Sequence, residues 1–572
     1  MCGIAGIVNL RGNPVEPAEI SRLTSLIAHR GPFGEGTWFN AKRNVAFGHR
    51  RLAIIDPGEG GYQPMVSGDG RHVIVYNGEI YNFLELRREL EAKGAVFRSQ
   101  SDTEVILAAW QAWGEDMLLR FNGMWALAIY DTATDELFLA RDRFGIKPML
   151  YALSSERFVF ASEQRALARS GLLETSLDID VARRLLLDPF GIEGSERTLY
   201  SQVRRLQGGH CMWLRQGRVQ VRRWWRTVDH LPAIPQTETE RVARFRDLFQ
   251  DSVALRMRSD VPIGTCLSGG FDSSAVICAM ASHEKAGMGP RDSTAWRHAF
   301  VATFPGASND ERPMAEEAAA WADVAPSFLE IGRADALTDL DRILDDNDDV
   351  YIGLPSAPWL IYRELRRQNV TVSLDGHGAD ELMGAYFQEG QSAAFRIRNA
   401  AAALMSRSRL AQRGIDFLRA QMISRQGRYF LRGGLTAIPA ALPLVAENDE
   451  LPDTWGALNR RLYRMFHSTT LPTILRNFDR LSMAHGIEVR MPFMDWRLVT
   501  YTMALPETSK SADGMTKVVA RQAMANLMPE SIRTARRKVG FNSPMPEWLN
   551  GPLAGWTAEL VERRGRRLAL LG

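Results

Sequence analysis

The first 225 residues are dominated by short apolar runs that end at Gly, Asp or Asn. HVIVYNGEI, WALAIYD and ELFLARD are examples, and each is rich in aliphatic or aromatic residues. Runs of this length between turn-forming residues are typical of β-strands. The pattern therefore predicts a sheet-rich first half, which closes near residues 208–225 with the hairpin-like stretch GGHCMWLRQGRVQVRRWW.

A different pattern begins near residue 240. Residues 238–257, ETERVARFRDLFQDSVALRM, place apolar side chains at helical intervals. Three short apolar runs then alternate with longer helical segments: VPIGTCLSG, HAFVATF and VTVSLDG. Runs that are apolar at successive positions are typical of parallel strands buried on both faces. The alternation predicts an α/β second half, and the Ala-, Arg- and Leu-rich stretch from about residue 385 predicts exposed helices.

The length of 572 residues exceeds what one hydrophobic core normally supports. Residues 226–240 have the polar, proline-bearing composition of a linker. We therefore expect two domains, at residues 2–225 and 241–572, joined by that linker.

Charge and cysteine content narrow the function classes. Lys and Arg number 70 against 67 Asp and Glu, and this net charge of +3 does not indicate a nucleic-acid or membrane partner. No apolar run reaches the roughly 18 residues of a membrane span, and the N-terminal residues lack the features of a signal peptide. The four cysteines (Cys2, Cys211, Cys266 and Cys278) form neither a zinc pattern nor a disulfide framework. We expect a cytoplasmic protein that acts on small molecules.

The loop CLSGGFDSSAV, between a predicted strand and a predicted helix, has the composition of an anion-binding turn. Gly269 and Gly270 permit a tight turn, and Ser268 and Ser273 lie beside the free N–H groups of a helix start. The loop lacks the Gly-Lys-Ser/Thr ending of a Walker A motif. Asp272 stands there instead, and a carboxylate beside phosphates implies a divalent cation such as Mg²⁺.

A second loop, VSLDGHGADE, places Asp380 and Glu381 among glycines after another predicted strand. Ligands of α/β sheets bind at the carboxyl ends of strands. Either loop alone is as readily an ordinary glycine turn, whereas the two together favour a nucleotide site with a metal.

These motifs resemble known families. SGGFDSS resembles the PP-loop of ATP pyrophosphatases, which cleave ATP between the α- and β-phosphates to make an acyl-adenylate. Together with MCGIAG it resembles the glutamine-hydrolysing asparagine synthetase B family. Further motifs follow in the family's order: RGPFGEG, HRRLAIID, YNGEIYNF, SDTEV, ARDRFGIKP, FASEQRAL, LDGHGADELMGAY, FDRLSMAHGIEVRMPFMD and RRKVGFNSPMPEWL.

The resemblance covers nearly the whole chain and implies its fold. The first domain would be a layered β-sandwich of the N-terminal nucleophile type that acts as a class II glutamine amidotransferase. The second would be an α/β PP-loop domain, similar to adenine nucleotide α-hydrolases, with a helical extension.

The resemblance also gives Cys2 a role, although a cysteine alone at this position is more typical of a small buried residue. Removal of Met1 would leave Cys2 with a free α-amine, whose pKa of about 7.7–8.0 suits it to take the thiol proton. The thiolate would attack glutamine, with Asn77 and the Gly78 N–H stabilising the oxyanion.

The same resemblance implies a pocket for the rest of glutamine. Arg51 would bind the α-carboxylate, and Glu79 and Asp102 would bind the α-ammonium. Asn77 and Gly78 complete this set. Such a charge arrangement matches a zwitterionic amino acid.

In the second domain the resemblance implies that Asp272 and Asp380 hold Mg²⁺. Lys538 would neutralise charge that develops during adenylation. The implied ATP-binding residues are Leu267, Ser268, Gly269, Gly270, Asp272, Ser273, Ala302, Asp375 and Gly376.

Two positions depart from the family's usual pattern. Phe33 stands where an aspartate is common, and we interpret it as tolerated loop variation. His377 stands where relatives generally carry Gln or Glu, beside the expected adenylation site. This histidine is either a neutral hydrogen-bonding replacement or a sign of an acceptor pocket adapted to another acid.

We therefore expect a glutamine- and ATP-dependent amide ligase that converts aspartate to asparagine and releases AMP and pyrophosphate. Amidation of a different carboxylic acid is the alternative. A scaffold protein without synthetase activity is a third interpretation, which the pairing of Cys2 with Asn77 and of Asp272 with Asp380 disfavours. A homodimer is compatible with these expectations.

Overall fold

The computed structural model describes residues 1–187, 189–307, 310–351, 355–384, 449–536, 543–544, 547–548, 551, 553–556 and 558–559. Within that part of the chain, no helix combines the length and apolar content needed to cross a bilayer.

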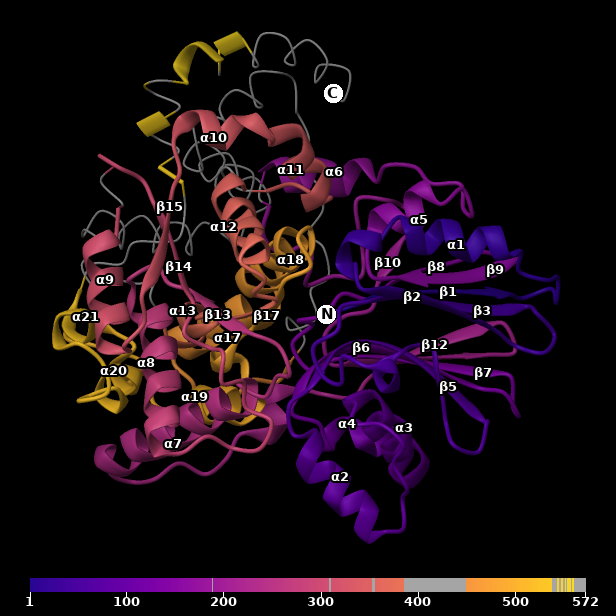
Figure 1. The fold of residues 1–572 in the computed structure, drawn as a ribbon, viewed down its shortest axis with the longest axis horizontal. Helices are drawn as coiled ribbons and strands as arrows, with labels where there is room; N and C mark the ends of the chain where they lie inside the picture. The colour runs from indigo at the N-terminus through magenta and orange to yellow at the C-terminus, as the bar shows by residue number, and fades with distance from the viewer. Residues whose placement is uncertain are drawn as a thin grey trace.

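Two six-stranded antiparallel sheets form the first half of the molecule (Figure 1). One sheet contains, in spatial order, β10 (Arg204–Arg205), β8 (Leu150–Leu153), β9 (Arg157–Ala161), β1 (Gly3–Asn9), β3 (Val45–Arg51) and β2 (Gly34–Phe39). The other contains β12 (Arg218–Arg223), β11 (His210–Arg215), β7 (Glu136–Arg141), β6 (Gly123–Asp131), β5 (His72–Ile80) and β4 (Met65–Val66).

Strand β5 shows why these runs are apolar at successive positions. Val73 and Val75 face the core between the two sheets, whereas Ile74 and Tyr76 pack on the opposite side. Successive side chains of a strand point to opposite faces, so a sheet covered on both faces needs both sets apolar. The layered β-sandwich expected from the sequence is confirmed.

Helices cover the outer faces of both sheets (Figure 1). Helices α1 (Pro17–Ser25) and α5 (Gln164–Arg169) pack on the first sheet. The second sheet is covered by α2 (Phe83–Ala92), α3 (Asp102–Trp113) and α4 (Met117–Arg120). A further helix, α6 (Ile179–Leu187), precedes β10.

The second half is built on a five-stranded parallel sheet, so the α/β expectation is also confirmed. Its spatial order is β15 (Pro326–Glu330), β14 (Ala299–Thr303), β13 (Ile263–Cys266), β16 (Val372–Leu374) and β17 (Glu488–Arg490). The chain leaves β13 toward β14 and β15, then returns to β16 on the other side of β13. The carboxyl ends of β13 and β16 therefore meet at a topological switch point, where α/β sheets bind ligands.

Helices surround this sheet, and α7 starts with a capping box in which Thr237 and Glu240 bond each other's backbone N–H groups. The helices are α7 (Glu238–Arg256), α8 (Phe271–Ala286), α9 (Arg312–Trp321), α10 (Arg333–Thr338), α11 (Leu340–Asn347), α12 (Ser356–Arg367), α13 (Ala379–Met383), α17 (Ala457–His467), α18 (Thr470–Met483), α19 (Trp496–Ala504), α20 (Val518–Ala523) and α21 (Glu530–Thr534). A small hairpin, β18 (Ser511–Ala512) and β19 (Met515–Thr516), precedes α20. The exposed helices expected from about residue 385 fall in 385–448, outside the described residues.

The two halves meet through buried charged side chains. Arg30 donates to both carboxylate oxygens of Asp479 on α18, at 2.9 and 3.1 Å. Arg258, just after α7, pairs with Glu85 on α2 at 2.6 Å. Removing one partner of the buried Arg30–Asp479 pair is costly, so that pair helps to fix how the halves sit together, and the half-exposed Glu85 adds a further contact.

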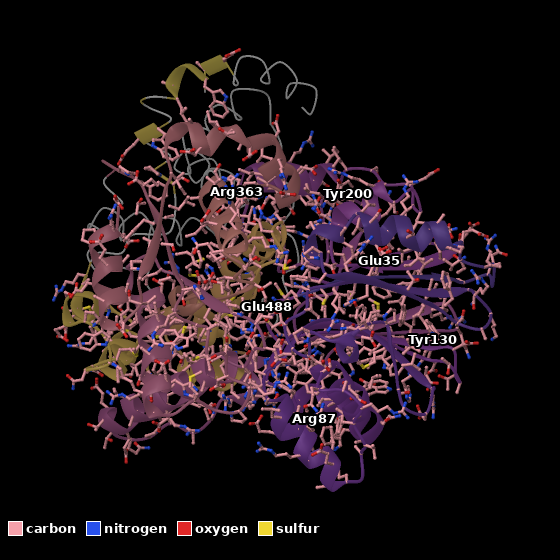
Figure 2. All side chains as sticks on the ribbon, in the orientation of Figure 1. Glu35, Arg87, Tyr130, Tyr200, Arg363 and Glu488 are labelled. Atoms are coloured by element: carbon pink, nitrogen blue, oxygen red, sulfur yellow. The ribbon has the colours of Figure 1, made fainter. Side chains whose placement is uncertain are left out.

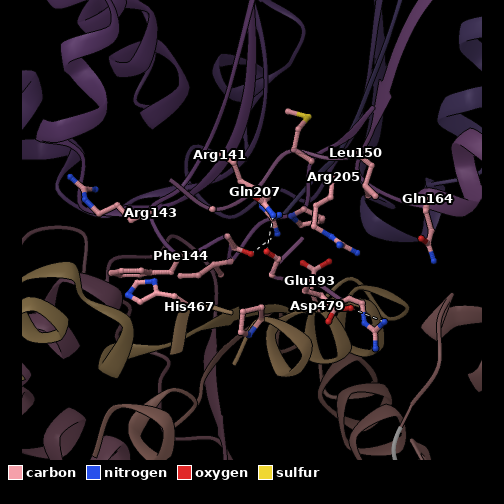
Figure 3. A pocket seen from close by; sticks show the side chains of 18 of the residues that line it. Arg141, Arg143, Phe144, Leu150, Gln164, Glu193, Arg205, Gln207, His467 and Asp479 are labelled. Atoms are coloured by element: carbon pink, nitrogen blue, oxygen red, sulfur yellow. Dashed lines mark hydrogen bonds and ion pairs between the residues drawn. The ribbon is translucent and has the colours of Figure 1, made fainter. Parts of the chain in front are cut away.

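Figure 3 shows a cavity of about 60 Å³ at this junction, between strands of the first half and helices of the second. Arg141 lines it and donates to the backbone carbonyls of Lys147, Leu206 and Gly145. Burial lowers the pKa of Arg141 to about 10. The three hydrogen bonds from its guanidinium hold loops of the first half in place.

Candidate active sites

Cys2 lies immediately before β1, deep in the interface between the halves. Its backbone N–H donates to Asn77 Oδ1 at 3.0 Å, and its Sγ lies 4.0 Å from the carbonyl oxygen of Leu52. Burial raises the pKa of the thiol, although the nearby N-terminal charge opposes this shift. A thiol in this setting needs a base to become a nucleophile.

Met1 is itself buried, and its ammonium nitrogen lies 3.1 Å from Glu488 Oε2. Glu488 belongs to β17 of the second half, and Figure 2 places it where the two halves meet. The start of the chain is therefore held by a carboxylate from the other half.

Asn77 and Gly78 lie side by side on β5, opposite Ala126 and Trp125 of β6. Asn77 Nδ2 is buried and has no hydrogen-bond partner in the described part of the protein. A Cβ atom at Gly78 would come 2.1 Å from the carbonyl oxygen of Met124, so the backbone here admits only glycine. An unsatisfied buried donor next to a thiol is the arrangement that a developing oxyanion requires.

A small cavity of about 30 Å³ opens beside the thiol. Arg51 lines it and is held by the carbonyl oxygens of Gly58 at 2.7 Å and Asp56 at 2.5 Å. The guanidinium carbon also lies 4.5 Å from the ring centre of Tyr62. Arg51 has no carboxylate partner among the described residues, which leaves its charge available to an anionic group.

Glu79 and Asp102 line the same cavity. Asp102 accepts hydrogen bonds from the Tyr76 hydroxyl at 2.9 Å and the Ile80 N–H at 3.1 Å. Burial nevertheless raises the pKa of Asp102 to about 6. Burial, with the repulsion of Asp102, raises the pKa of Glu79 well above its ordinary value. Two buried carboxyl groups and an arginine in one cavity suit a ligand that carries both a positive and a negative charge.

The second half contributes to this pocket. Arg490 on β17 donates to Glu488 at 2.7 Å and lies 3.3 Å from Glu79 Oε2. The amine of Met1, the two glutamates and Arg490 thus form one ion cluster across the interface. Five of the residues expected for glutamine binding and hydrolysis line this cavity or adjoin it: Cys2, Arg51, Gly78, Glu79 and Asp102.

A second cavity, of about 520 Å³, lies at the switch point between β13 and β16. The loop after β13 is folded on itself: Ser268 N–H donates to Ser273 Oγ at 3.1 Å, and Gly270 N–H to Ser268 Oγ at 3.2 Å. Gly269 has a φ of +82°, a left-handed conformation that favours glycine. The loop leads directly into α8, whose N-terminus points a positive dipole end at the cavity.

The loop after β16 forms the opposite wall. Asp375 is buried and accepts hydrogen bonds from the hydroxyls of Ser373 at 2.5 Å and Tyr362 at 2.8 Å. A Cβ atom at Gly376 would come 2.7 Å from the backbone carbon of Asp272, so the two loops touch there. The tertiary structure thus brings together two motifs that lie about a hundred residues apart.

His377 lines this cavity with a side chain 20% exposed. Its Nε2 lies 3.6 Å from Asp375 Oδ2, and its ring centre lies 4.0 Å from that of Phe478. The imidazole is held between a carboxylate and an aromatic ring and faces the space beside the phosphate loop.

Asp272 and Asp380 approach one another as the sequence predicts, and a third side chain lies between them. Lys517 Nζ is 2.6 Å from both oxygens of Asp272 and 2.5 Å from Asp380 Oδ1. Two carboxylates that share one cation fit the hard oxygen donors that Mg²⁺ prefers. No cluster of three or more His, Cys, Asp or Glu side chains suited to a metal occurs among the described residues.

The remaining predicted nucleotide residues lie apart from the cavity wall. Leu267 is buried behind the loop, with its N–H bonded to the Phe300 carbonyl, and Ala302 lies on β14. Lys538 falls outside the described residues.

Sequence reasoning missed Lys517, Glu488 and Arg490. Lys517 stands in an ordinary-looking helix start, GMTKVVARQ, and nothing local marks it. The run GIEVRMPF did carry a signal, because it places two charges inside an otherwise apolar strand. Charged residues in a buried strand must find partners, and here they find them in the other half.

The fold and the two cavities together suit a class of two-domain enzyme that joins a pocket containing a thiol to a glycine-loop cavity in an α/β domain. Comparison with known families agrees with this class. Residues 1–225 match the glutamine amidotransferase domain, and residues 244–571 match asparagine synthase. The chain belongs to the asparagine synthase family and is an asparagine synthetase-like, glutamine-hydrolysing ligase.

Relatives match over nearly the whole chain. Asparagine synthetase 1 of Bacillus subtilis is 29% identical over 98% of this chain and 90% of its own length. Asparagine synthetase 3 of the same organism is 30% identical over 96% of this chain and 88% of its own. A protein named Amidase chry2, from Gibberella zeae, is 25% identical over 98% and 92%.

Proposed function

We propose that this enzyme converts aspartate to asparagine, with glutamine as the nitrogen source and with AMP and pyrophosphate as products. The observation that carries the proposal is the pairing of two cavities, one with a thiol and charges matched to an amino acid, the other at a phosphate loop. The named activity of the Bacillus subtilis relatives supports the choice of reaction.

In the first cavity, Cys2 acts as the nucleophile once Met1 is removed. The α-amine takes the thiol proton, and sulfur attacks the side-chain amide carbon of glutamine. The tetrahedral oxyanion accepts hydrogen bonds from Asn77 Nδ2 and the Gly78 N–H. The carbon–nitrogen bond then breaks, ammonia leaves with the proton returned to it, and water releases glutamate from the thioester.

Charge positions the substrate in that cavity. Arg51 binds the α-carboxylate, and Glu79 and Asp102 bind the α-ammonium. The buried carboxyl groups gain a cationic partner on binding, which favours their ionised forms.

In the second cavity, the β13 loop and the N-terminus of α8 bind the phosphates of ATP. An oxygen of the acceptor carboxylate attacks the α-phosphorus, and the bond to pyrophosphate breaks. Ammonia then attacks the acyl carbon and AMP leaves. Asp272 and Asp380 would hold Mg²⁺, and the metal would neutralise negative charge on the phosphates. Lys538 would neutralise charge during adenylation.

The division of labour follows the domain limits of 2–225 and 241–572, with 226–240 as the linker. We take the enzyme to act as a homodimer, with no nucleic-acid or membrane partner.

A panel of acids tests the acceptor. Glutamine-dependent AMP release is measured for aspartate and for other mono- and dicarboxylic acids, in the parent enzyme and in His377→Gln. A site that hydrogen-bonds a particular polar group can discriminate by roughly 10⁴-fold against a substrate that lacks this group. The values of kcat/KM should therefore differ strongly between the acids.

We expect aspartate to give the highest kcat/KM in both proteins, since His377 then serves as a neutral hydrogen-bonding replacement. A parent enzyme that is inert toward aspartate but adenylates another acid would assign the reaction to that acid. The relative named as an amidase makes such acids worth including.

A further inference from the structure

The cation between Asp272 and Asp380 is part of the protein itself. Lys517 immediately precedes α20 and follows the β18–β19 hairpin, with a left-handed φ of +61°. Its side chain is 4% exposed, whereas those of Asp272 and Asp380 are 20% and 16% exposed. The ammonium therefore enters the cavity from behind, and the carboxylates face the open side.

The ion pair of Lys517 with Asp272 and Asp380 differs from a surface salt bridge because the ammonium is removed from water. Burial lowers the pKa of Lys517, and Asp272 opposes that shift. Two carboxylates that both lie within 2.6 Å of one nitrogen are also close to each other. Without a cation between them, their repulsion and desolvation would be severe.

A divalent cation and the Lys517 ammonium would compete for the same carboxylate oxygens of Asp272 and Asp380. Metal binding would therefore displace Lys517 from between the two aspartates. The cavity wall beside it includes Arg521, which lies on helix α20. A displaced lysine beside an arginine needs an anion, and the phosphates of a nucleotide supply it.

We infer that Lys517 is an internal counterion of Asp272 and Asp380, and that it moves to the polyphosphate when metal and nucleotide bind together. This rests on the proposed function of the cavity and deepens it. Metal alone binds weakly because it competes with Lys517, and metal and nucleotide each raise the affinity for the other, as linkage requires.

The experiment uses Mn²⁺ alone as the probe, titrated into the full-length protein with free Mn²⁺ followed by electron paramagnetic resonance. In the parent we expect weak binding without nucleotide and at least tenfold tighter binding with ATP. In Lys517→Met we expect binding of one Mn²⁺ without nucleotide to become at least tenfold tighter than in the parent. Adding Asp272→Asn to that variant removes the new site.

Arg533→Gln is the matched control, because it removes one positive charge from the neighbouring α21. Among the described residues, Arg533 pairs with Glu530 and forms no ion pair with either aspartate, so Mn²⁺ binding without nucleotide should stay as in the parent. Far-UV circular dichroism confirms that each variant is folded.

Equal Mn²⁺ affinity of the parent and Lys517→Met without nucleotide would overturn the inference. If that variant does not fold, the parent titration decides, since tight Mn²⁺ binding without ATP contradicts an internal counterion. AMP release by the parent is measured alongside. Its absence with every acid contradicts the proposed function, whereas the Mn²⁺ contrast tests Lys517 alone.

Discussion

The side chains of the proposed glutamine pocket are arranged to meet the charges of an amino acid ligand. Glu79 and Asp102 are buried together, so the ionised form of each is disfavoured. Within the described part of the chain, Arg51 contacts only carbonyl oxygens and an aromatic ring, and the buried Asn77 amide donor has no partner there. A buried donor such as Asn77 Nδ2 that lacks a partner is costly to the fold, and a bound substrate would satisfy it.

Cys2→Ala should abolish glutamine-dependent synthesis and leave ammonia-dependent synthesis intact, because the thiol serves only the first half-reaction. Both rates are measured as AMP release. Cys211→Ala is the control: Cys211 is another buried cysteine of the same half, on β11, and its loss should leave both activities in place. Loss of ammonia-dependent synthesis in a folded Cys2→Ala protein contradicts the assignment.

The pKa of Asp102, about 6 because of burial, predicts a pH dependence. The ionised carboxylate binds the substrate ammonium, so the KM for glutamine should rise up to about tenfold per unit as pH falls below 6. Asp102→Asn should raise the KM by about 10–100-fold, the loss of a charged hydrogen bond of roughly 1.5–3 kcal/mol, and flatten its pH dependence.

Glutamate release from pH 5 to 8 provides the measurement for Asp102, with Asp116→Asn as the control. Asp116 is an exposed acid of the same half. A KM that does not change with pH in the parent would exclude Asp102 as the ammonium ligand.

Secondary structure elements matter here mainly through where they end. Strand β17 is only three residues long, yet it hydrogen-bonds β16 of the synthetase sheet and sends Glu488 and Arg490 into the glutaminase site. The loops after β13 and β16 meet because those strands are neighbours in the sheet. One short edge strand therefore supplies Glu488 to the glutamine pocket and pairs with β16, whose following loop lines the nucleotide cavity.

Gly376→Ala should separate the two nucleotide loops. Its Cβ would come 2.7 Å from both the backbone carbon and the Cβ of Asp272, and backbone cannot yield as a flexible side chain can. We expect AMP formation to fall at least tenfold while glutamine hydrolysis persists. Gly555→Ala is the control, since a Cβ there meets no described atom within 4 Å. Unchanged AMP formation in Gly376→Ala would show that the loops need not touch.

Across the whole molecule, charged pairs buried between the halves align the two sites. Helix α18 supplies Asp479 to Arg30, and Arg30 Nε also donates to the carbonyl oxygen of Cys2 at 3.2 Å. Next to it, Arg480 lies 3.0 Å from Glu163 of the first half. The position of the nucleophile is thus tied directly to a helix of the synthetase half.

Asp479→Asn should destabilise the protein by roughly 1.5–3 kcal/mol, because it removes one of the two carboxylates, Asp479 and Glu163, that pair with the buried Arg30. It should also raise the glutamate formed per AMP. Burial opposes ionisation of Asp479, but Arg30 and Lys147 lower its pKa below 3.8. Its stabilising effect is therefore present above that pH and lost as pH falls further, so the difference from the parent should shrink on acidification.

Denaturant unfolding at neutral and acidic pH measures this effect. Asp341→Asn removes an exposed acid on α11 and should change stability by no more than about 0.5 kcal/mol. Equal stability of the parent and Asp479→Asn at neutral pH would contradict a structural role for the pair with Arg30.

The local sequence pattern predicted strands of the sandwich, the parallel strands β13, β14 and β16, and the two glycine-rich loops. It could do so because strand periodicity and turn propensity depend on residues that are neighbours in the sequence. It also singled out Cys2 and Asp272, whose chemistry depends on residue type. The tertiary structure alone decided that the loops of β13 and β16 touch, that Glu488 reaches the amine of Met1, and that Lys517 lies between two aspartates. Those contacts join residues more than a hundred positions apart, and they depend on strand order and domain packing, which no local pattern encodes.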